Sequence, residues 1–332
     1  MGKIYFVTNR NAKGPKSKPT GFGKKFNTDS IDSLRFGTAK VVSGEVRSVS
    51  IAPEKLKKTT NESLHGSKAV FAELLKSMQD GVDTLVYIHG YKVSFDEALA
   101  AGAQLQKRYK GSKGINVVVF SWPSDGSMMP FLAYKRDRSD AVTSALAFSR
   151  ALIKLYEFLK LVRKNTACKA KLHLLCHSMG NYVLRNGIQE VRREKGYIPR
   201  VFDEIFLMAA DEDHDAFEHD HKFGPLHELG QAINVYFNIR DTALVISDKT
   251  KANPTRLGSR GPRLPLAVPG NVNVIDATEV VGGMVEHSYY LDDRYTVRDV
   301  NAVLRGGAAD EIKGRRYVAA QNRYVIGKKN VV

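Results

Sequence analysis

The chain has 332 residues, of which 43% are hydrophobic and 26% are charged. This composition is ordinary for a globular protein, and no apolar run approaches the roughly 20 residues that a membrane-spanning helix needs. Lys and Arg number 51 against 35 Asp and Glu, which gives a formal net charge of +16. Such an excess attracts anionic partners, so contact with an anionic or membrane surface stays open, but we expect mainly a solvated basic surface. No recognised nucleic-acid motif is present, so we predict no specific nucleic-acid partner.

The first ten residues contain one Lys and only a short apolar stretch. They lack the apolar core and the cleavage site of a signal peptide, so we interpret them as a first strand and expect a cytoplasmic protein. The two cysteines, Cys168 and Cys176, show no zinc-ligand spacing. In a reducing compartment we expect both to be free thiols.

The N-terminal part of the chain gives weak signals for regular structure. Residues 11–30 are rich in Gly, Lys, Pro, Ser and Asn, which predicts an exposed loop. Residues 36–51 partly alternate apolar and polar side chains, which predicts one or two early strands.

From residue 82 the pattern becomes regular. Short apolar runs predict strands buried on both faces, at residues 84–88, 116–120, 171–176, 204–210, 233–238 and 271–277. Amphipathic stretches between or after them predict helices, at residues 94–109, 137–163, 179–193 and 297–305.

This alternation of strands and helices predicts an α/β fold with a mostly parallel central sheet flanked by helices. We expect residues 1–80 to form N-terminal strands and a loop that pack on a core of residues 81–332, within one structural domain. Ligands of such sheets bind beyond the carboxyl ends of the strands. Functional side chains are therefore expected directly after the strands.

The most informative motif lies at the end of the third regular strand, where residues 174–181 read Leu-Leu-Cys-His-Ser-Met-Gly-Asn. A serine between a buried strand and a helix, with small residues two positions to either side, is typical of a nucleophile elbow. Gly180 fills one small position, and Cys176 fills the other, where Gly is usual. Ser178 is therefore the predicted nucleophile. A helix N-cap role would explain the serine but not its small neighbours.

A second motif, His89-Gly90-Tyr91, follows the first regular strand. In α/β-hydrolases a His-Gly dipeptide at this point shapes half of the oxyanion hole. A backbone N–H without a bulky side chain in front of it is the physical requirement, and Gly90 permits it. We predict that the amides of Tyr91 and Met179 are the two donors to the oxyanion.

The chain order of this fold is serine, acid, histidine. Asp241 follows the fifth regular strand and fits best as the acid. Asp211, which follows the strand before it, stays open as an alternative acid. His287 lies in the loop after the last strand and is the predicted base, since neutral imidazole accepts the serine proton while a carboxylate fixes its tautomer.

Two further features have less specific interpretations. Trp122 ends a strand on the expected active-site side, where it either lines a substrate pocket or packs the loop. Residues 211–221 are dense in Asp, Glu and His but have no recognised ligand spacing. We expect a solvated loop there and no metal site.

The chain resembles the bacterial α/β-hydrolases of the esterase/lipase superfamily that were long catalogued as a domain of unknown function. The matching pieces occur in order at residues 5–10, 36–37, 86–91, 94–98, 120–124, 177–181, 209–211, 241–244, 256–258 and 287–289. The resemblance implies an α/β-hydrolase fold and a serine hydrolase without a cofactor. It supports Ser178 and His287 in their roles and mildly favours Asp241 as the acid. Lys92 stands where the family often has Asn, beside the oxyanion loop, and is expected to favour acidic substrates.

The sequence thus predicts a hydrolase that cleaves small-molecule or lipid esters through an acyl-enzyme on Ser178. An acyltransferase or a thioesterase would use the same three residues. A non-catalytic protein that binds through its basic surface is a third possibility, since fold alone does not imply function. The intact order of nucleophile, acid and base argues against it.

Overall fold

The structure is a computed structural model that describes most of the chain. The described residues are 2–15, 19–27, 33–52, 66–111, 113–124, 130–165, 168–244, 255–282 and 287–328. Among the helices in these ranges, none combines the length and the apolar character that crossing a membrane requires.

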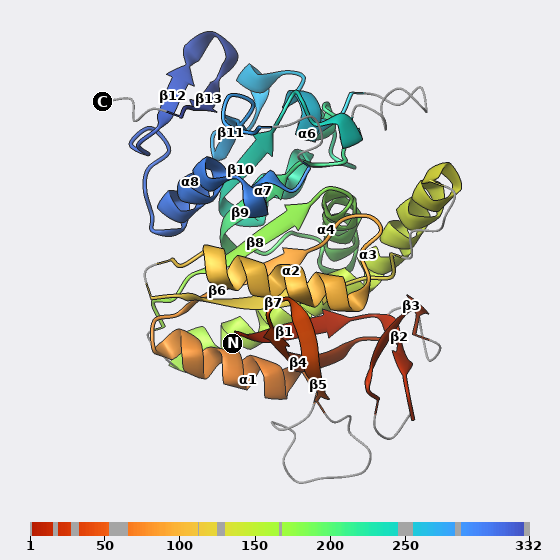
Figure 1. Cartoon of the computed structure of the whole chain (residues 1–332). Helices are drawn as coiled ribbons and strands as arrows, with labels where there is room; N and C mark the ends of the chain where they lie inside the picture. The colour runs from red at the N-terminus through yellow and green to blue at the C-terminus, as the bar shows by residue number, and fades with distance from the viewer. Residues whose placement is uncertain are drawn as a thin grey trace.

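The core of the molecule is an 11-stranded sheet, counted over the described residues, in the order β12-β13-β11-β10-β9-β8-β6-β7-β1-β4-β5 (Figure 1). Its strands are β1 (Gly2–Thr8), β4 (Arg35–Val42), β5 (Glu45–Ile51), β6 (Asp83–Ile88), β7 (Ile115–Ser121), β8 (Leu172–His177), β9 (Phe202–Met208), β10 (Gly230–Phe237), β11 (Val272–Asp276), β12 (Arg315–Val318) and β13 (Arg323–Ile326). In this order, all neighbouring strands between β13 and β1 pair in parallel. The β1–β4, β4–β5 and β12–β13 pairings at the two edges are antiparallel.

The central strands form where the sequence has uninterrupted apolar runs. All residues of β6, β7 and β8 are buried, as expected of parallel strands covered on both faces. The N-terminal β1 pairs in parallel with β7 and so extends this central sheet. The mostly parallel sheet flanked by helices confirms the predicted α/β architecture.

Helices cover both faces of the sheet. On one face lie α1 (Gly66–Gln79), α3 (Pro130–Asn165) and α4 (Gly180–Lys195), whose apolar side chains share one core cluster. On the other lie α2 (Phe95–Arg108), α7 (Tyr289–Asp292) and α8 (Arg294–Leu304). The short α6 (Leu257–Arg260) follows β10, and 3-10 turns occur at Ala216–Glu218, Gly224–Glu228, Pro265–Ala267 and Ala319–Gln321.

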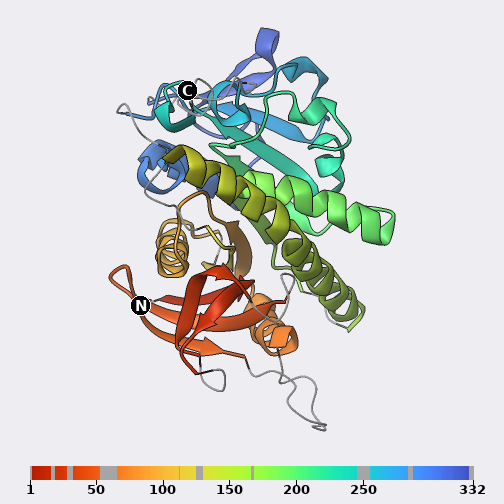
Figure 2. The ribbon, with the colours of Figure 1, turned by 90° about the vertical axis from the view of Figure 1, so that its right-hand side faces the viewer.

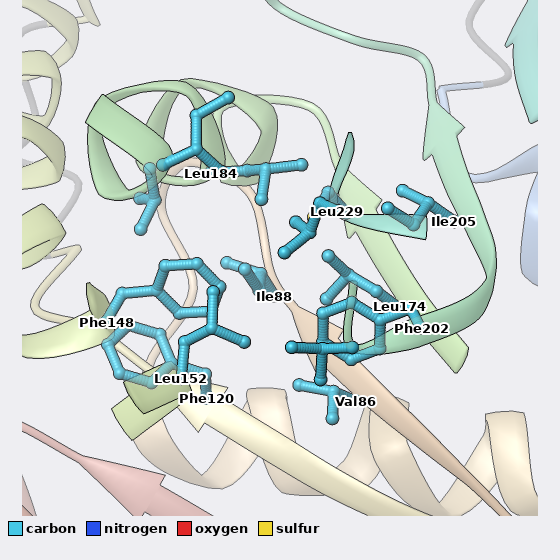
Figure 3. Close-up of a cluster of buried hydrophobic side chains, with 14 of the residues drawn as sticks. Val86, Ile88, Phe120, Phe148, Leu152, Leu174, Leu184, Phe202, Ile205 and Leu229 are labelled. Atoms are coloured by element: carbon cyan, nitrogen blue, oxygen red, sulfur yellow. The ribbon is translucent and has the colours of Figure 1, made fainter. Parts of the chain in front are cut away.

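The first of these faces carries a dense apolar core. Figure 2 shows α3 and α4 running alongside each other across the sheet, and the two helices are in contact. In Figure 3, Leu184 of α4 and Phe148 of α3 point toward Ile88 and Leu174 of the strands below. All four side chains are almost fully buried. This packing holds the N-terminus of α4 above the carboxyl end of β8.

Specific residues define the helix boundaries near the sheet edge. Ser94 caps α2 in a capping box, in which its side chain accepts from the amide of Glu97 and the Glu97 side chain accepts from the amide of Ser94. Gly196 ends α4 in the left-handed conformation, with φ of 78°. The Ser94 cap ends the short connection between β6 and α2, which belongs to the site described below.

The loop predicted for residues 11–30 is wrong where the structure describes it. β2 (Arg10–Lys13) and β3 (Gly21–Phe26) pair as an antiparallel hairpin, while residues 16–18 and 28–30 lie outside the described ranges. The polar composition concealed Phe22, which is 3% exposed and packs against Phe6 and Phe95. One buried aromatic residue thus anchors a hairpin whose other residues are mostly polar or glycine.

Other boundaries also differ from the sequence-based expectation. The helix α1 was not predicted, although Val70, Phe71, Leu74 and Met78 form its buried face at helical spacing. The strands β12 and β13 were missed because each has only four residues. The strand predicted at residues 204–210 ends at Met208, since Ala209 has φ of 45°, which is incompatible with continued β structure.

Candidate active site

The turn between β8 and α4 places Ser178 in a strained position. Ser178 has φ of 52°, and its amide donates to the carbonyl of Met208 at 2.9 Å. A β-carbon on Gly180 would lie 2.5 Å from the carbonyl oxygen of Ile88 and 2.7 Å from that of His89. Only glycine fits there without moving backbone. The strand, turn and helix expected of a nucleophile elbow are therefore present.

The strain at residue 178 gives a measurable stability difference. Left-handed backbone costs a residue with a β-carbon roughly 1–2 kcal/mol, whereas glycine adopts it readily. We expect Ser178→Gly to have a free energy of unfolding about 1 kcal/mol higher than that of Ser178→Ala. Urea unfolding of both variants measures this difference. Equal stability of the two would contradict strain at this position.

The loop after β6 packs directly on the elbow. A β-carbon on Gly90 would lie 2.8 Å from the β-carbon of Ser178 and 3.2 Å from Nδ1 of His177. The backbone N–H of Met179 has no hydrogen-bond acceptor among the described residues. A small residue thus allows this loop to reach the serine, beside an amide that is available to a ligand.

Two of the predicted residues are joined by a short hydrogen bond. Nδ1 of His287 lies 2.7 Å from Oδ2 of Asp241, whose side chain is fully buried. The other carboxylate oxygen accepts from the amide of Leu244 at 3.3 Å. The carboxylate therefore accepts the Nδ1–H of His287, and Nε2 is left as the basic nitrogen of the neutral ring.

His177 links the His287 loop to the elbow. Its Nε2–H donates to the carbonyl of His287 at 3.1 Å, and the two rings lie 4.7 Å apart between centroids. Burial lowers the pKa of His177 well below its ordinary value, and the neighbouring His287 lowers it further. A neutral His177 does not repel positive charge on His287. No separate role was predicted for His177, although it directly precedes the serine.

Two tyrosines that the sequence left without a role anchor the segment after His287. The hydroxyl of Tyr289 donates to the carbonyl of Tyr236 at 2.9 Å and accepts from the amide of Ala209 at 3.0 Å. The hydroxyl of Tyr290 lies 2.8 Å from that of Tyr87 in β6. The sequence signal that could have indicated this anchoring role is the pair of consecutive tyrosines shortly after the candidate base. They attach this segment to several strands of the sheet.

The alternative acid Asp211 lies near the elbow but has other partners. Its backbone amide donates to the carbonyl of Ser178 at 3.2 Å. Its carboxylate accepts from the hydroxyl of Tyr134 at 2.7 Å and lies 3.2 Å from Nε of Arg256. Within the described residues, the acid that contacts His287 is Asp241.

The solvated loop expected at residues 211–221 is wrong for its first three acids. Asp211, Glu212 and Asp213 are all buried. Arg256 binds Asp213 at 2.6 Å, and Arg185 binds Glu212 at 2.9 Å. These arginines, of which Arg256 is fully buried, supply the compensating charge that the sequence pattern did not reveal. Among the described residues, no cluster of His, Cys, Asp and Glu has the arrangement of a metal site.

The remaining predicted residues lie in or against the loop after β6. Trp122 is fully buried, stacks on the ring of His89 at 5.3 Å, and donates its indole N–H to the carbonyl of His89 at 2.9 Å. Of the two interpretations offered for Trp122, packing against the loop is therefore the one that the structure shows. Lys92 has φ of 57°, and its amide donates to Asp137 at 3.3 Å. Its influence on substrate charge stays a prediction.

Comparisons with known proteins complete this description. A family model described as "Alpha/beta hydrolase of unknown function" (DUF900) matches residues 64–304. No curated protein matches the chain. A solved structure of a protein presumed to be a cell surface hydrolase, from Lactobacillus plantarum WCFS1, is 16% identical. The match covers 70% of this chain and 93% of that one, with a TM-score of 0.32. Because the family model spans well over half of the sequence, the chain belongs to this family of α/β-hydrolases.

Proposed function

We propose that this hydrolase cleaves carboxylic esters through an acyl-enzyme on Ser178, with His287 as general base and Asp241 as its orienting acid. The observation that supports this best is the 2.7 Å contact between Nδ1 of His287 and the buried Asp241. Further support comes from the strained turn that holds Ser178. The serine directly follows His177, whose ring contacts the carbonyl of His287.

In the first half of the reaction, Oγ of Ser178 attacks the ester carbonyl carbon while its proton passes to Nε2 of His287. The amides of Tyr91 and Met179 donate to the oxyanion of the tetrahedral intermediate. The intermediate collapses when the C–O bond to the alcohol breaks, and His287 returns the proton to the departing alkoxide.

In the second half, water attacks the acyl-enzyme and gives its proton to His287. The carboxylic acid leaves and Ser178 regains its proton. Asp241 stays ionised throughout, keeps the proton of the neutral ring on Nδ1, and stabilises the imidazolium that forms twice per cycle.

The test is hydrolysis of p-nitrophenyl esters from acetate to palmitate, combined with labelling by a fluorophosphonate. We expect turnover of at least part of the ester series and covalent phosphonylation of the peptide that contains Ser178, detected by mass spectrometry. The chain-length profile distinguishes a short-chain esterase from a lipase. Absence of both turnover and labelling would overturn the proposal. Release of more than one equivalent of p-nitrophenol per enzyme only when an added alcohol or thiol accepts the acyl group would indicate an acyltransferase.

A further inference from the structure

A buried arginine from the N-terminal segment lies beneath the oxyanion loop. Arg10 begins β2, just after β1, and its side chain is fully buried. Its Nε–H donates to Oγ of Ser121 at the end of β7, at 2.9 Å. One terminal nitrogen donates to the carbonyl of Gly23 at 3.2 Å, and the other donates to the carbonyl of Val93 at 2.7 Å. The guanidinium thus joins β7, the β2–β3 hairpin and the loop after β6.

Arg10 also contacts the histidine that begins this loop. The terminal nitrogen of Arg10 that binds Val93 also lies 3.4 Å from Nε2 of His89. The backbone amide of Trp122 donates to this Nε2 atom as well, at 3.2 Å. Two donors that face Nε2 require it to be the unprotonated nitrogen of the ring. Burial lowers the pKa of His89 to about 3, and the adjacent Arg10 contributes to this lowering. His89 is therefore neutral, with its proton on Nδ1.

The position of that proton fixes a peptide group in the oxyanion loop. Nδ1 of His89 lies 2.9 Å from the carbonyl oxygen of Gly90, so the Nδ1–H donates to it. No cis peptide bond occurs in the described residues, and a trans peptide directs its C=O and its N–H to opposite sides. The N–H of Tyr91 consequently points away from His89. A flip of this peptide would put the Gly90 carbonyl where the oxyanion donor is needed.

We propose that Arg10 is a positioning residue that holds His89 in its Nδ1–H tautomer and thereby fixes the Tyr91 amide as an oxyanion donor. This inference rests on the proposed function, because an oxyanion hole matters only if acyl transfer occurs. Arg10 acts through His89 and the loop backbone. It also lies outside residues 64–304, which the family model covers. The N-terminal strands would therefore complete the active site as well as extend the sheet.

The first test reads the tautomer in the wild-type protein and needs no activity. Nitrogen-15 NMR of histidine-labelled protein separates the two tautomers and the imidazolium, and the His89→Asn variant identifies the His89 signals by their loss. We expect the wild-type His89 to show a protonated Nδ1 and an unprotonated Nε2. A protonated Nε2, in either the neutral or the charged ring, would overturn the proposal.

The second test compares kcat and KM for the best p-nitrophenyl ester in the wild type, Arg10→Gln and Arg10→Lys. We expect Arg10→Gln to lower kcat by about 10- to 100-fold with little change in KM, since a misplaced donor affects the transition state more than substrate binding. The Arg10→Lys variant keeps the charge but loses the fork of donors, and should recover part of kcat.

Arg315→Gln is the matched control, because Arg315 is equally buried but pairs with Asp299 at 2.7 Å at the far edge of the sheet. At a temperature where all variants are folded by circular dichroism, Arg315→Gln should keep the wild-type kcat. An inactive wild type would refute the proposed function. The NMR measurement would then still show whether His89 carries its proton on Nδ1, because that test does not depend on activity. An active wild type with an unchanged kcat in Arg10→Gln would refute the role of Arg10.

His89→Asn and His89→Leu provide a check that leaves Arg10 in place. The side-chain amide of Asn can replace the Nδ1–H donor to the Gly90 carbonyl, whereas Leu cannot donate. We expect His89→Asn to keep a kcat about tenfold above that of His89→Leu, because only the former still fixes the peptide. Equal losses in the two variants would show that the hydrogen bond to Gly90 is irrelevant to turnover.

Discussion

Ser178→Ala is expected to lower kcat for ester hydrolysis by about 10⁵-fold or more, because the variant cannot form an acyl-enzyme. The proposed oxyanion donors, the amides of Tyr91 and Met179, are backbone groups that the substitution leaves in place. Residual turnover above the uncatalysed rate is therefore expected, since binding and oxyanion stabilisation persist without the nucleophile. Steady-state kinetics with the best p-nitrophenyl ester measures the loss, and fluorophosphonate labelling of residue 178 should vanish with it.

Ser149→Ala is the control for this substitution. Ser149 is buried as well, at 0% exposed against 6% for Ser178, but its hydroxyl donates to the carbonyl of Leu146 within α3, at 2.8 Å. We expect this variant to keep kcat and fluorophosphonate labelling at wild-type levels. Full turnover in Ser178→Ala would eliminate the acyl-enzyme on this residue, whatever the control shows.

The features that could be predicted from sequence are those that local patterns specify. An uninterrupted apolar run predicts a parallel strand buried on both faces, and β6, β7 and β8 follow such runs closely. The turn at Ser178 is equally local, because Gly180 stands where a β-carbon would meet backbone oxygens at 2.5 and 2.7 Å. The choice of Asp241 and His287 needed only the chain order of the fold and their positions after strands; the two side chains are in contact, and their catalytic roles stay a prediction.

The missed features depend on register between distant segments. Arg10 reaches the loop after β6 only because β1 lies beside β7, with Thr8 opposite Ser121. The acids at 211–213 have the composition of a solvated loop, but Arg256, more than forty positions away, pairs with Asp211 and Asp213. A sequence pattern shows the charge of such residues but not the partner that compensates it.

Replacing Asp241 by Asn is the second substitution with a large expected effect. The buried carboxylate accepts Nδ1–H of His287 at 2.7 Å. An amide can present its N–H to Nδ1 instead, which would move the ring proton to Nε2 and block proton uptake from Ser178. We expect kcat to fall by about 10⁴-fold, with a folded protein and little change in KM. Kinetics and circular dichroism on the purified variant measure both.

Asp211→Asn decides between the two acids that the sequence left open. This carboxylate binds Tyr134 and Arg256 in place of His287. Its replacement leaves the Arg256 cation with weaker compensation, so the free energy of unfolding should fall by about 3 kcal/mol. The kcat of the folded fraction should stay within about tenfold of wild type, because the tautomer of His287 is unaffected. If Asp211→Asn lost 10⁴-fold in kcat while Asp241→Asn stayed active, the acid would be Asp211, and the contact between Asp241 and His287 would be only structural.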